Sequence, residues 1–224
     1  MSVKRKRAVT GGKRAGAPSL HGPRNAFEIE VRSCARELAL MRPMLLADFS
    51  AAALAAALPD PSPRFVDLCL ASSNLQERMP ADLRDRTRTL VWSFALQLAA
   101  LDNGVSLVHG DFGKWNLLMR KGAGTWTVAA ILDWEFAVSG PPPIDLGHFL
   151  RYECASRPLL EPHFSEGFLQ AGGSLPEGWR RAARVVDSIA LCESLTHDTL
   201  PAAVVAELLE LVRSTVEDRD PQFS

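Results

Sequence analysis

The chain has 224 residues, of which 47% are hydrophobic, and its 25 basic and 26 acidic side chains give a formal net charge of −1. This length is enough for one domain, or for one large lobe with a smaller companion, and the apolar fraction is enough for a core. The sequence contains no uncharged apolar run of about 18 residues and no apolar segment near its start. We therefore expect a cytoplasmic protein, with neither membrane insertion nor export.

The basic residues and the cysteines are distributed unevenly. Residues 1–24 contain seven lysines and arginines and no acid. We expect a disordered basic tail there, and contact with nucleic acid or anionic lipid is the alternative. Cys34, Cys69, Cys154 and Cys192 are far apart and each lies in an apolar stretch, which indicates buried thiols rather than a disulfide framework or a metal site.

The first half of the chain predicts helices that are separated by a proline-rich loop. Asn25 can cap an amphipathic helix that ends at Pro43. Residues 51–58 predict a short alanine-rich helix, and residues 59–63 predict a loop that can separate two lobes. Apolar positions at helical spacing then predict a longer helix over residues 81–102, which leads directly into the next segments.

Three short apolar segments follow and predict the strands of one small β-sheet. They are residues 105–108, 117–119 and 128–132. After the prolines at 141–143 the helical pattern returns. The helices that it predicts lie near residues 145–154, 162–171, 177–196 and 201–216.

Polar side chains follow these strands in a pattern that is typical of phosphoryl transfer. Asp111 comes shortly after the first strand, Asn116 lies five residues later, and Asp133 follows the third strand. The reaction needs a carboxylate that orients and deprotonates the acceptor hydroxyl, and oxygen ligands that hold magnesium against the phosphates. We expect Asp111 to be the catalytic carboxylate, and Asn116 and Asp133 to bind magnesium. For Asp133 the added argument is that a carboxylate leaving an apolar strand needs a partner to offset its desolvation.

Simpler roles remain open for two of these residues. An Asp after Gly is common in turns, and an Asn in a loop often closes it with a side-chain hydrogen bond. The complete HGDxxxxN pattern, followed 17 residues after its Asn by an Asp on the next strand, favours the functional roles.

This segment resembles the aminoglycoside phosphotransferase and choline kinase group of small-molecule kinases, whose catalytic loop has the Asp-to-Asn spacing of protein kinases. Residues 141–147, PPPIDLG, are similar to the PxxDLA element of that group. Residues 164–179 are similar to a helix and turn of its C-terminal lobe. The resemblance covers roughly residues 80–215, and its motifs are specific between residues 107 and 150.

The resemblance implies an α+β, protein-kinase-like fold. A mainly helical C-terminal lobe over residues 61–224 would surround the small catalytic sheet, and residues 25–60 would be an abridged N-terminal lobe. The implied cofactors are ATP and magnesium, and the implied substrate is a hydroxyl of a small molecule such as an aminoglycoside, another amino alcohol or a sugar. Acids of the C-terminal helices, Glu153 and Glu161 among them, would suit a cationic substrate, although exposed helix acids are the ordinary explanation.

The same resemblance implies further site residues. Leu118 and Leu132 are similar to positions that form the floor under an adenine ring, a role compatible with core packing. Glu30 resembles the helix acid that pairs with the nucleotide-binding lysine. His109 and Asp145 resemble residues that support the catalytic loop, and capping of a helix alone would also explain Asp145.

Two parts of the kinase architecture cannot be identified in the sequence. None of the three lysines before Lys114 lies in an apolar strand of the VAIK type, and the glycine-rich residues 9–16 do not match GxGxxG. The alternative function is therefore a catalytically impaired relative that binds a ligand or partner. A nucleic-acid-binding protein that uses the basic tail is a third hypothesis, which only charge supports. The sequence leaves the oligomeric state open.

Overall fold

The computed structural model describes residues 31–32, 62–101, 106–122, 126–153 and 159–219. Within these ranges the fold is α+β and mainly helical, with short antiparallel strands, which confirms the predicted class and is consistent with a kinase-like fold. The helices are α3 (Pro63–Ala71), α4 (Ser73–Arg78), α5 (Ala81–Ser93), α6 (Ala95–Leu101), α7 (Pro143–Leu150), α8 (Glu161–Gln170), α9 (Trp179–Ser194) and α10 (Ala202–Val216). The strands are β1 (Ser106–Val108), β2 (Leu117–Lys121), β3 (Trp126–Ile131) and β4 (Val138–Gly140), and two short 3-10 helices are η1 (Lys114–Asn116) and η2 (Trp134–Phe136).

The helices of the second half lie where the sequence predicts them. The predictions for α7, α8, α9 and α10 are right in position, with ends that differ by a few residues. The predicted helix over residues 81–102 is interrupted at Phe94, which separates α5 from α6. The helices expected after Asn25 and over residues 51–58 lie outside the described residues, except for Val31 and Arg32, which are helical.

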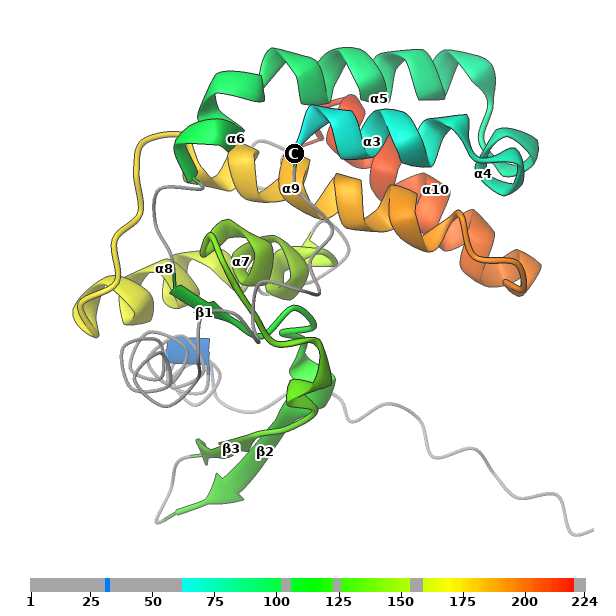
Figure 1. Cartoon of the computed structure of the whole chain (residues 1–224). Helices are drawn as coiled ribbons and strands as arrows, with labels where there is room; N and C mark the ends of the chain where they lie inside the picture. The colour runs from blue at the N-terminus through cyan, green and yellow to red at the C-terminus, as the bar shows by residue number, and fades with distance from the viewer. Residues whose placement is uncertain (1–30, 33–61, 102–105, 123–125, 154–158, 220–224) are drawn as a thin grey trace, which may run out of the picture.

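The prediction of a single sheet is wrong in the described part of the chain. Strand β1 pairs antiparallel with β4, and β2 pairs antiparallel with β3, in two separate sheets of two strands. Strand β4 escaped prediction because three residues that include a glycine carry no period-2 pattern. Between β1 and β2 the backbone turns at Gly110, which has a φ of 81°, so the β2–β3 hairpin leaves the direction of β1 and projects from the helical body (Figure 1).

The core has two parts, and α9 contributes to both. The helical cluster consists of buried side chains from α3 to α6, α9 and α10, such as Val66, Val91 and Leu195. The site cluster lies under the strands and contains a row of aromatic rings whose centroids are 4.5–6.4 Å apart. These rings belong to Phe112, Phe149, Phe164 and Phe168. Each buried phenylalanine contributes about 1.5–3 kcal/mol.

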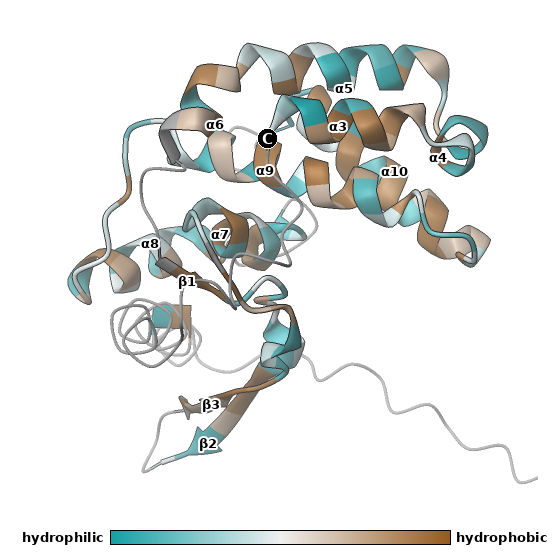
Figure 2. Ribbon diagram, viewed as in Figure 1, coloured by the Kyte–Doolittle hydropathy of each residue, from teal (hydrophilic) through white to brown (hydrophobic). Residues whose placement is uncertain are grey.

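The distribution of polarity agrees with this arrangement. The helices are amphipathic, with one apolar and one polar face. Strand β3 is mainly apolar, whereas the outer end of β2 is polar (Figure 2). Cys69 and Cys192 are buried free thiols, as predicted, and burial raises the pKa of Cys69 to about 11. Cys34 and Cys154 lie outside the described residues. None of the described helices combines the length and the apolar character needed to cross a membrane.

Candidate active site

The loop that follows β1 is held from below by α7. Asp145, which is fully buried in the first turn of α7, accepts hydrogen bonds from two consecutive backbone amides. Its Oδ2 lies 2.9 Å from the nitrogen of His109, and its Oδ1 lies 3.0 Å from the nitrogen of Gly110. Asp145 does not cap its own helix, because Pro142 occupies the N-cap. Of the two explanations for Asp145, the structure therefore supports the one in which it holds the loop.

The His109 ring joins this loop to the end of β3. It is fully buried, and its Nδ1 accepts a hydrogen bond from the nitrogen of Asp111 at 3.2 Å. Since Nδ1 is the acceptor, the ring proton lies on Nε2, which donates to the carbonyl oxygen of Leu132 at 2.7 Å. The backbone nitrogen of Leu132 donates in turn to the carbonyl oxygen of Asn116 at 2.8 Å. The residue directly before Asp133 is thus bound to both halves of the Asp111 loop.

Asp111 and Asn116 are in direct contact. Asn116 is buried at the end of η1, and its amide nitrogen donates to the backbone oxygen of Asp111 at 2.8 Å and to the Asp111 Oδ2 at 3.0 Å. Because both bonds use the nitrogen, the carbonyl oxygen of the Asn116 amide accepts no hydrogen bond from the described part of the chain and can act as a ligand atom. Phe112, which directly follows Asp111, is fully buried in the site cluster, while the Asp111 side chain is 43% exposed. The loop therefore presents the Asp111 carboxylate to solvent from an anchored backbone.

Asp133 lies at the N-cap of η2 in the left-handed region, with φ of 59° and ψ of 58°. This conformation is rare for a residue with a side chain, Asp and Asn being the main exceptions, and it occurs often at functional sites. The Asp133 side chain is exposed, so the expectation that it needs a partner to offset burial is wrong. Within the described residues the structure gives it no hydrogen bond and no ion pair. The bonds of Leu132 hold the backbone that precedes Asp133 against the Asp111 loop.

The residues expected under an adenine ring are both exposed. Leu118 on β2 is 51% exposed, and Leu132 after β3 is 42% exposed. Neither belongs to the core, so both can contact a ligand, and an exposed apolar side chain is by itself no sign of one. Glu30 lies outside the described residues, and its expected role remains a prediction.

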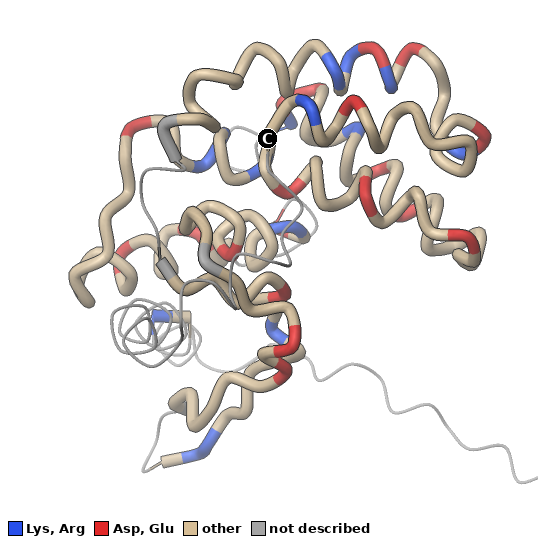
Figure 3. Tube along the Cα trace, in the orientation of Figure 1, with Lys and Arg blue, Asp and Glu red and all other residues tan. Residues whose placement is uncertain are grey.

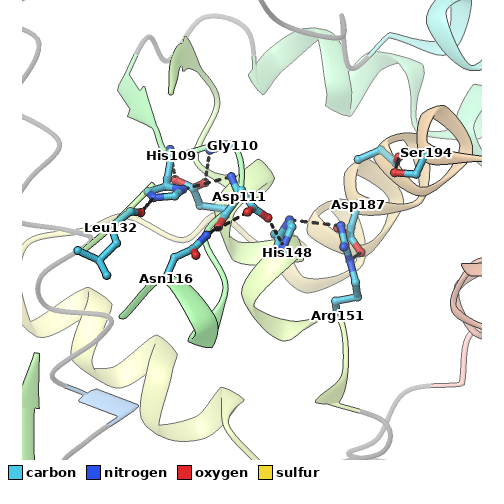
Figure 4. A network of polar contacts seen from close by, with 11 residues as sticks. His109, Gly110, Asp111, Asn116, Leu132, His148, Arg151, Asp187 and Ser194 are labelled. Atoms are coloured by element: carbon cyan, nitrogen blue, oxygen red, sulfur yellow. Dashed lines mark hydrogen bonds and ion pairs between the residues drawn. The ribbon is translucent and has the colours of Figure 1, made fainter. Parts of the chain in front are cut away.

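His148 also contacts the site, and it was not predicted from the sequence. This residue lies in the last turn of α7, and its Nε2 is 3.0 Å from the Asp111 Oδ1 (Figure 4). A signal was present, because residues three apart in a helix share a face. Since Asp145 was expected to contact the loop, His148 on the same helix face points to the same loop.

The charges around the site suit a cation. Acidic residues gather where the β2–β3 hairpin meets the helices (Figure 3). No group of three His, Cys, Asp or Glu side chains in the described part of the chain is arranged as a metal cage. Magnesium at a phosphoryl-transfer site does not require such a cage, because it keeps waters and is bound through one or two carboxylates together with substrate phosphates. The carbonyl oxygen of Asn116 and the carboxylate of Asp133 are donors of this kind.

The comparison with known families agrees with this geometry. The sequence model of the phosphotransferase enzyme family, APH, matches residues 28–185. This range contains the whole segment from His109 to Asp133 and also α7. Among curated proteins, none matches the chain significantly. The family match covers more than half of the chain, and therefore this chain belongs to the phosphotransferase enzyme family.

Proposed function

We propose that this protein is a kinase that transfers the γ-phosphoryl group of ATP, with magnesium, to a hydroxyl of a small molecule. The observation that carries the proposal is the pair of contacts between Asn116 and Asp111 within the family-matched segment. They leave an exposed carboxylate beside an amide oxygen that is free to bind a metal ion. Such an arrangement suits phosphoryl transfer, in which the protein mainly positions the reactants and stabilises charge.

Asp111 is the base in this proposal. Its Oδ2 accepts a hydrogen bond from the Asn116 amide, its Oδ1 lies 3.0 Å from the His148 Nε2, and each oxygen keeps a lone pair for a further partner. One of these lone pairs accepts the hydrogen bond of the acceptor hydroxyl. As the new bond between the acceptor oxygen and phosphorus forms and the bond to the departing ADP breaks, the hydroxyl proton moves to Asp111.

The magnesium ligands of the protein are the Asn116 carbonyl oxygen and the Asp133 carboxylate. When bound, magnesium neutralises charge on the phosphates. The chain holds both ligands on one hydrogen-bonded unit, since Leu132, the neighbour of Asp133, is bound to the backbone oxygen of Asn116. Leu118 and Leu132 provide exposed apolar surface on which an adenine ring can lie.

The predicted division of the chain belongs to this proposal. Residues 61–224 form the catalytic lobe, residues 25–60 form an abridged nucleotide-binding lobe, and residues 1–24 are a basic tail. With no recognisable strand lysine in the sequence, the phosphates are held mainly through magnesium. The acceptor is an aminoglycoside-like molecule, another amino alcohol or a sugar.

The test is the conservative variant Asp111→Asn. This variant removes the base. With an acceptor that the wild-type protein phosphorylates, we expect kcat for ADP formation to fall by about 10²–10⁴-fold. The melting temperature should change little, because the Asp111 side chain is 43% exposed. Asp85→Asn, on the exposed face of α5, is the matched control and should keep wild-type kcat.

Nucleotide binding is measured separately. Millimolar ATP with magnesium should raise the melting temperature of the wild-type protein, and EDTA should abolish the increase. If no nucleotide shifts the melting temperature and no acceptor in a panel of aminoglycosides, amino alcohols and sugars gives ADP, the chain is an impaired relative that binds a ligand or partner. A variant Asp111→Asn with undiminished kcat would disprove the role of Asp111 alone.

A further inference from the structure

The contact between Asp111 and His148 is part of a longer chain of polar contacts. Behind His148, its Nδ1 lies 3.3 Å from the Nη2 of Arg151. Arg151 in turn makes three contacts of 2.7–3.2 Å with the carboxylate of Asp187 on α9. Figure 4 shows these groups in a row from the Asp111 loop across α7 to α9. The side chains of Arg151 and Asp187 are only 14% and 7% exposed.

The partners of the His148 ring determine where its proton lies. A guanidinium can only donate hydrogen bonds, so the contact with Arg151 requires a lone pair on Nδ1. The single proton of the neutral ring is therefore on Nε2. Nε2 lies 3.0 Å from the Asp111 Oδ1, so the protonated nitrogen of His148 is in close polar contact with the carboxylate.

The surroundings of His148 favour the neutral ring. Burial lowers its pKa from the ordinary value, and the charge of Arg151 lowers it further, as does the His109 ring to a smaller extent. The carboxylates of Asp187 and Asp111 act in the opposite direction without reversing the result. A neutral donor orients Asp111 and leaves its negative charge uncompensated, which an imidazolium at the same place would not do.

We propose that His148 is a positioning residue of this site, whose Nε2–H group, oriented by the Arg151–Asp187 pair, fixes the Asp111 carboxylate for the acceptor hydroxyl. This inference rests on the proposed function, because it takes Asp111 as the base. The Asn116 amide donates to one oxygen of Asp111, and the His148 Nε2 lies 3.0 Å from the other. Polar contacts at both oxygens restrict the rotation of the carboxylate plane, so that its remaining lone pairs keep one direction.

A proton-transfer role for His148 itself does not fit these contacts. Its Nε2 already carries a proton, and its Nδ1 lone pair faces a cation. The ring therefore has no site at which to accept the proton of a substrate.

Two variants of the full-length protein separate positioning from the other roles. In His148→Gln the amide nitrogen can take the place of Nε2 and donate to Asp111, and we expect kcat within about fivefold of wild type. In His148→Leu the volume is largely kept and the donor is lost, and we expect kcat to fall about 10–100-fold, with the KM for ATP and for the acceptor within about threefold. His197→Leu, at an exposed histidine after α9, is the control and should match wild type.

The pH dependence of kcat adds a readout that packing alone would not change. Because His148 is neutral, the profile of His148→Gln should run parallel to that of wild type between about pH 6.5 and pH 9. Equal kcat values for His148→Leu and wild type would overturn the proposal. So would a His148→Gln variant as impaired as His148→Leu, since that result would require an imidazole that exchanges protons.

A measurement without turnover keeps this inference separate from the proposed function. Two-bond ¹H–¹⁵N spectra, with the His148 signals identified by their loss in His148→Gln, should show a neutral ring protonated on Nε2 at pH 7. A ring protonated on Nδ1, or a doubly protonated ring, contradicts the contacts described above even if the protein is an active kinase. If the ring shows the expected tautomer but the protein neither binds ATP nor forms ADP, the proposed function fails and the contacts of His148 stand.

Discussion

Gly110 occupies the position in the site where a side chain is least tolerable. Its φ is 81°, a conformation that L-residues with a Cβ rarely adopt, and a Cβ there would overlap the carbonyl oxygen of Phe136. Its backbone nitrogen also donates to Asp145. We expect Gly110→Ala to lower the free energy of unfolding by about 1–3 kcal/mol and to lower kcat, because the loop that carries Asp111 must shift. Urea unfolding and ADP formation measure the two effects.

Gly172→Ala is the matched control for Gly110→Ala. Gly172 has a φ of 89°, but a Cβ there would meet nothing within 4 Å. The difference in stability between the two variants therefore isolates the clash with Phe136 from the cost of the backbone conformation, about 1 kcal/mol. Equal losses of stability, with unchanged kcat in Gly110→Ala, would show that the loop tolerates this displacement.

At the scale of residues, the sequence indicated which side chains approach each other only where they share a motif. Asp111 and Asn116 lie five residues apart in one loop, and their contact was expected from that spacing. His148 is 37 residues beyond Asp111 in the sequence, and only the packing of α7 under the loop brings the two together. The exposure of Asp133 was not predictable, because burial depends on what covers the end of β3.

The packing of α7 against α9 determines the position of the site's supporting residues. Gly147 lies at this contact, and a Cβ there would overlap the carbonyl oxygen of Ala183 on α9. Since a helix backbone cannot yield locally, Gly147→Ala should push α7 away from α9 and cost about 1–3 kcal/mol of stability. We also expect kcat to fall, because α7 carries both Asp145 and His148. Thermal unfolding and steady-state kinetics test this expectation.

Gly113→Ala provides the comparison for the stability of Gly147→Ala. Gly113 has a φ of −116°, which any residue can adopt, and a Cβ there would meet its neighbours at 3.4 Å or more. We expect Gly113→Ala to change stability by less than about 0.5 kcal/mol. If Gly147→Ala were equally mild, α7 and α9 would not be in the close contact described here.

At the scale of elements, long periodic segments were predictable and short ones were not. Helices α9 and α10 repeat their apolar positions over 16 and 15 residues, so their patterns are unambiguous. Helix α3 follows a cluster of prolines and α4 has only six residues, and neither was predicted. The pairing of β1 with β4 is a tertiary choice that the pattern of β1 alone does not specify.

In the molecule as a whole, the two parts of the core leave a cavity between α7, α9 and α10 that contains buried acids. Glu153 and Glu161 line it, together with Arg180 and Asp187. Both glutamates are at least 96% buried, so neither is the exposed helix acid that composition favours. Arg180 pairs with Glu161 at 2.6 Å. The Glu153 Oε1 accepts a hydrogen bond from the Glu161 backbone, and its Oε2 has no partner within the described residues.

This environment makes stability depend on pH through Glu153. Burial raises its pKa from 4.5 to about 7, with Glu161 adding to the increase, whereas backbone hydrogen bonds and Arg180 oppose it. Between these pH values the folded protein binds more protons at Glu153 than the unfolded chain does. The contribution of Glu153 to the free energy of unfolding is therefore most favourable at pH 4.5 and below, and it decreases as the pH rises to about 7.

Glu153→Gln, which imitates the protonated carboxyl and keeps an oxygen for the Glu161 amide, should therefore stabilise the protein at alkaline pH. Each pKa unit corresponds to about 1.4 kcal/mol, and we expect a gain of about 1–3 kcal/mol at pH 8, with almost none near pH 4.5. Urea unfolding at both pH values measures the gain. Glu77→Gln, at an exposed position of α4, should show no pH-dependent difference from wild type. A gain of the same size at both pH values would mean that the pKa of Glu153 is the same in the folded and the unfolded protein.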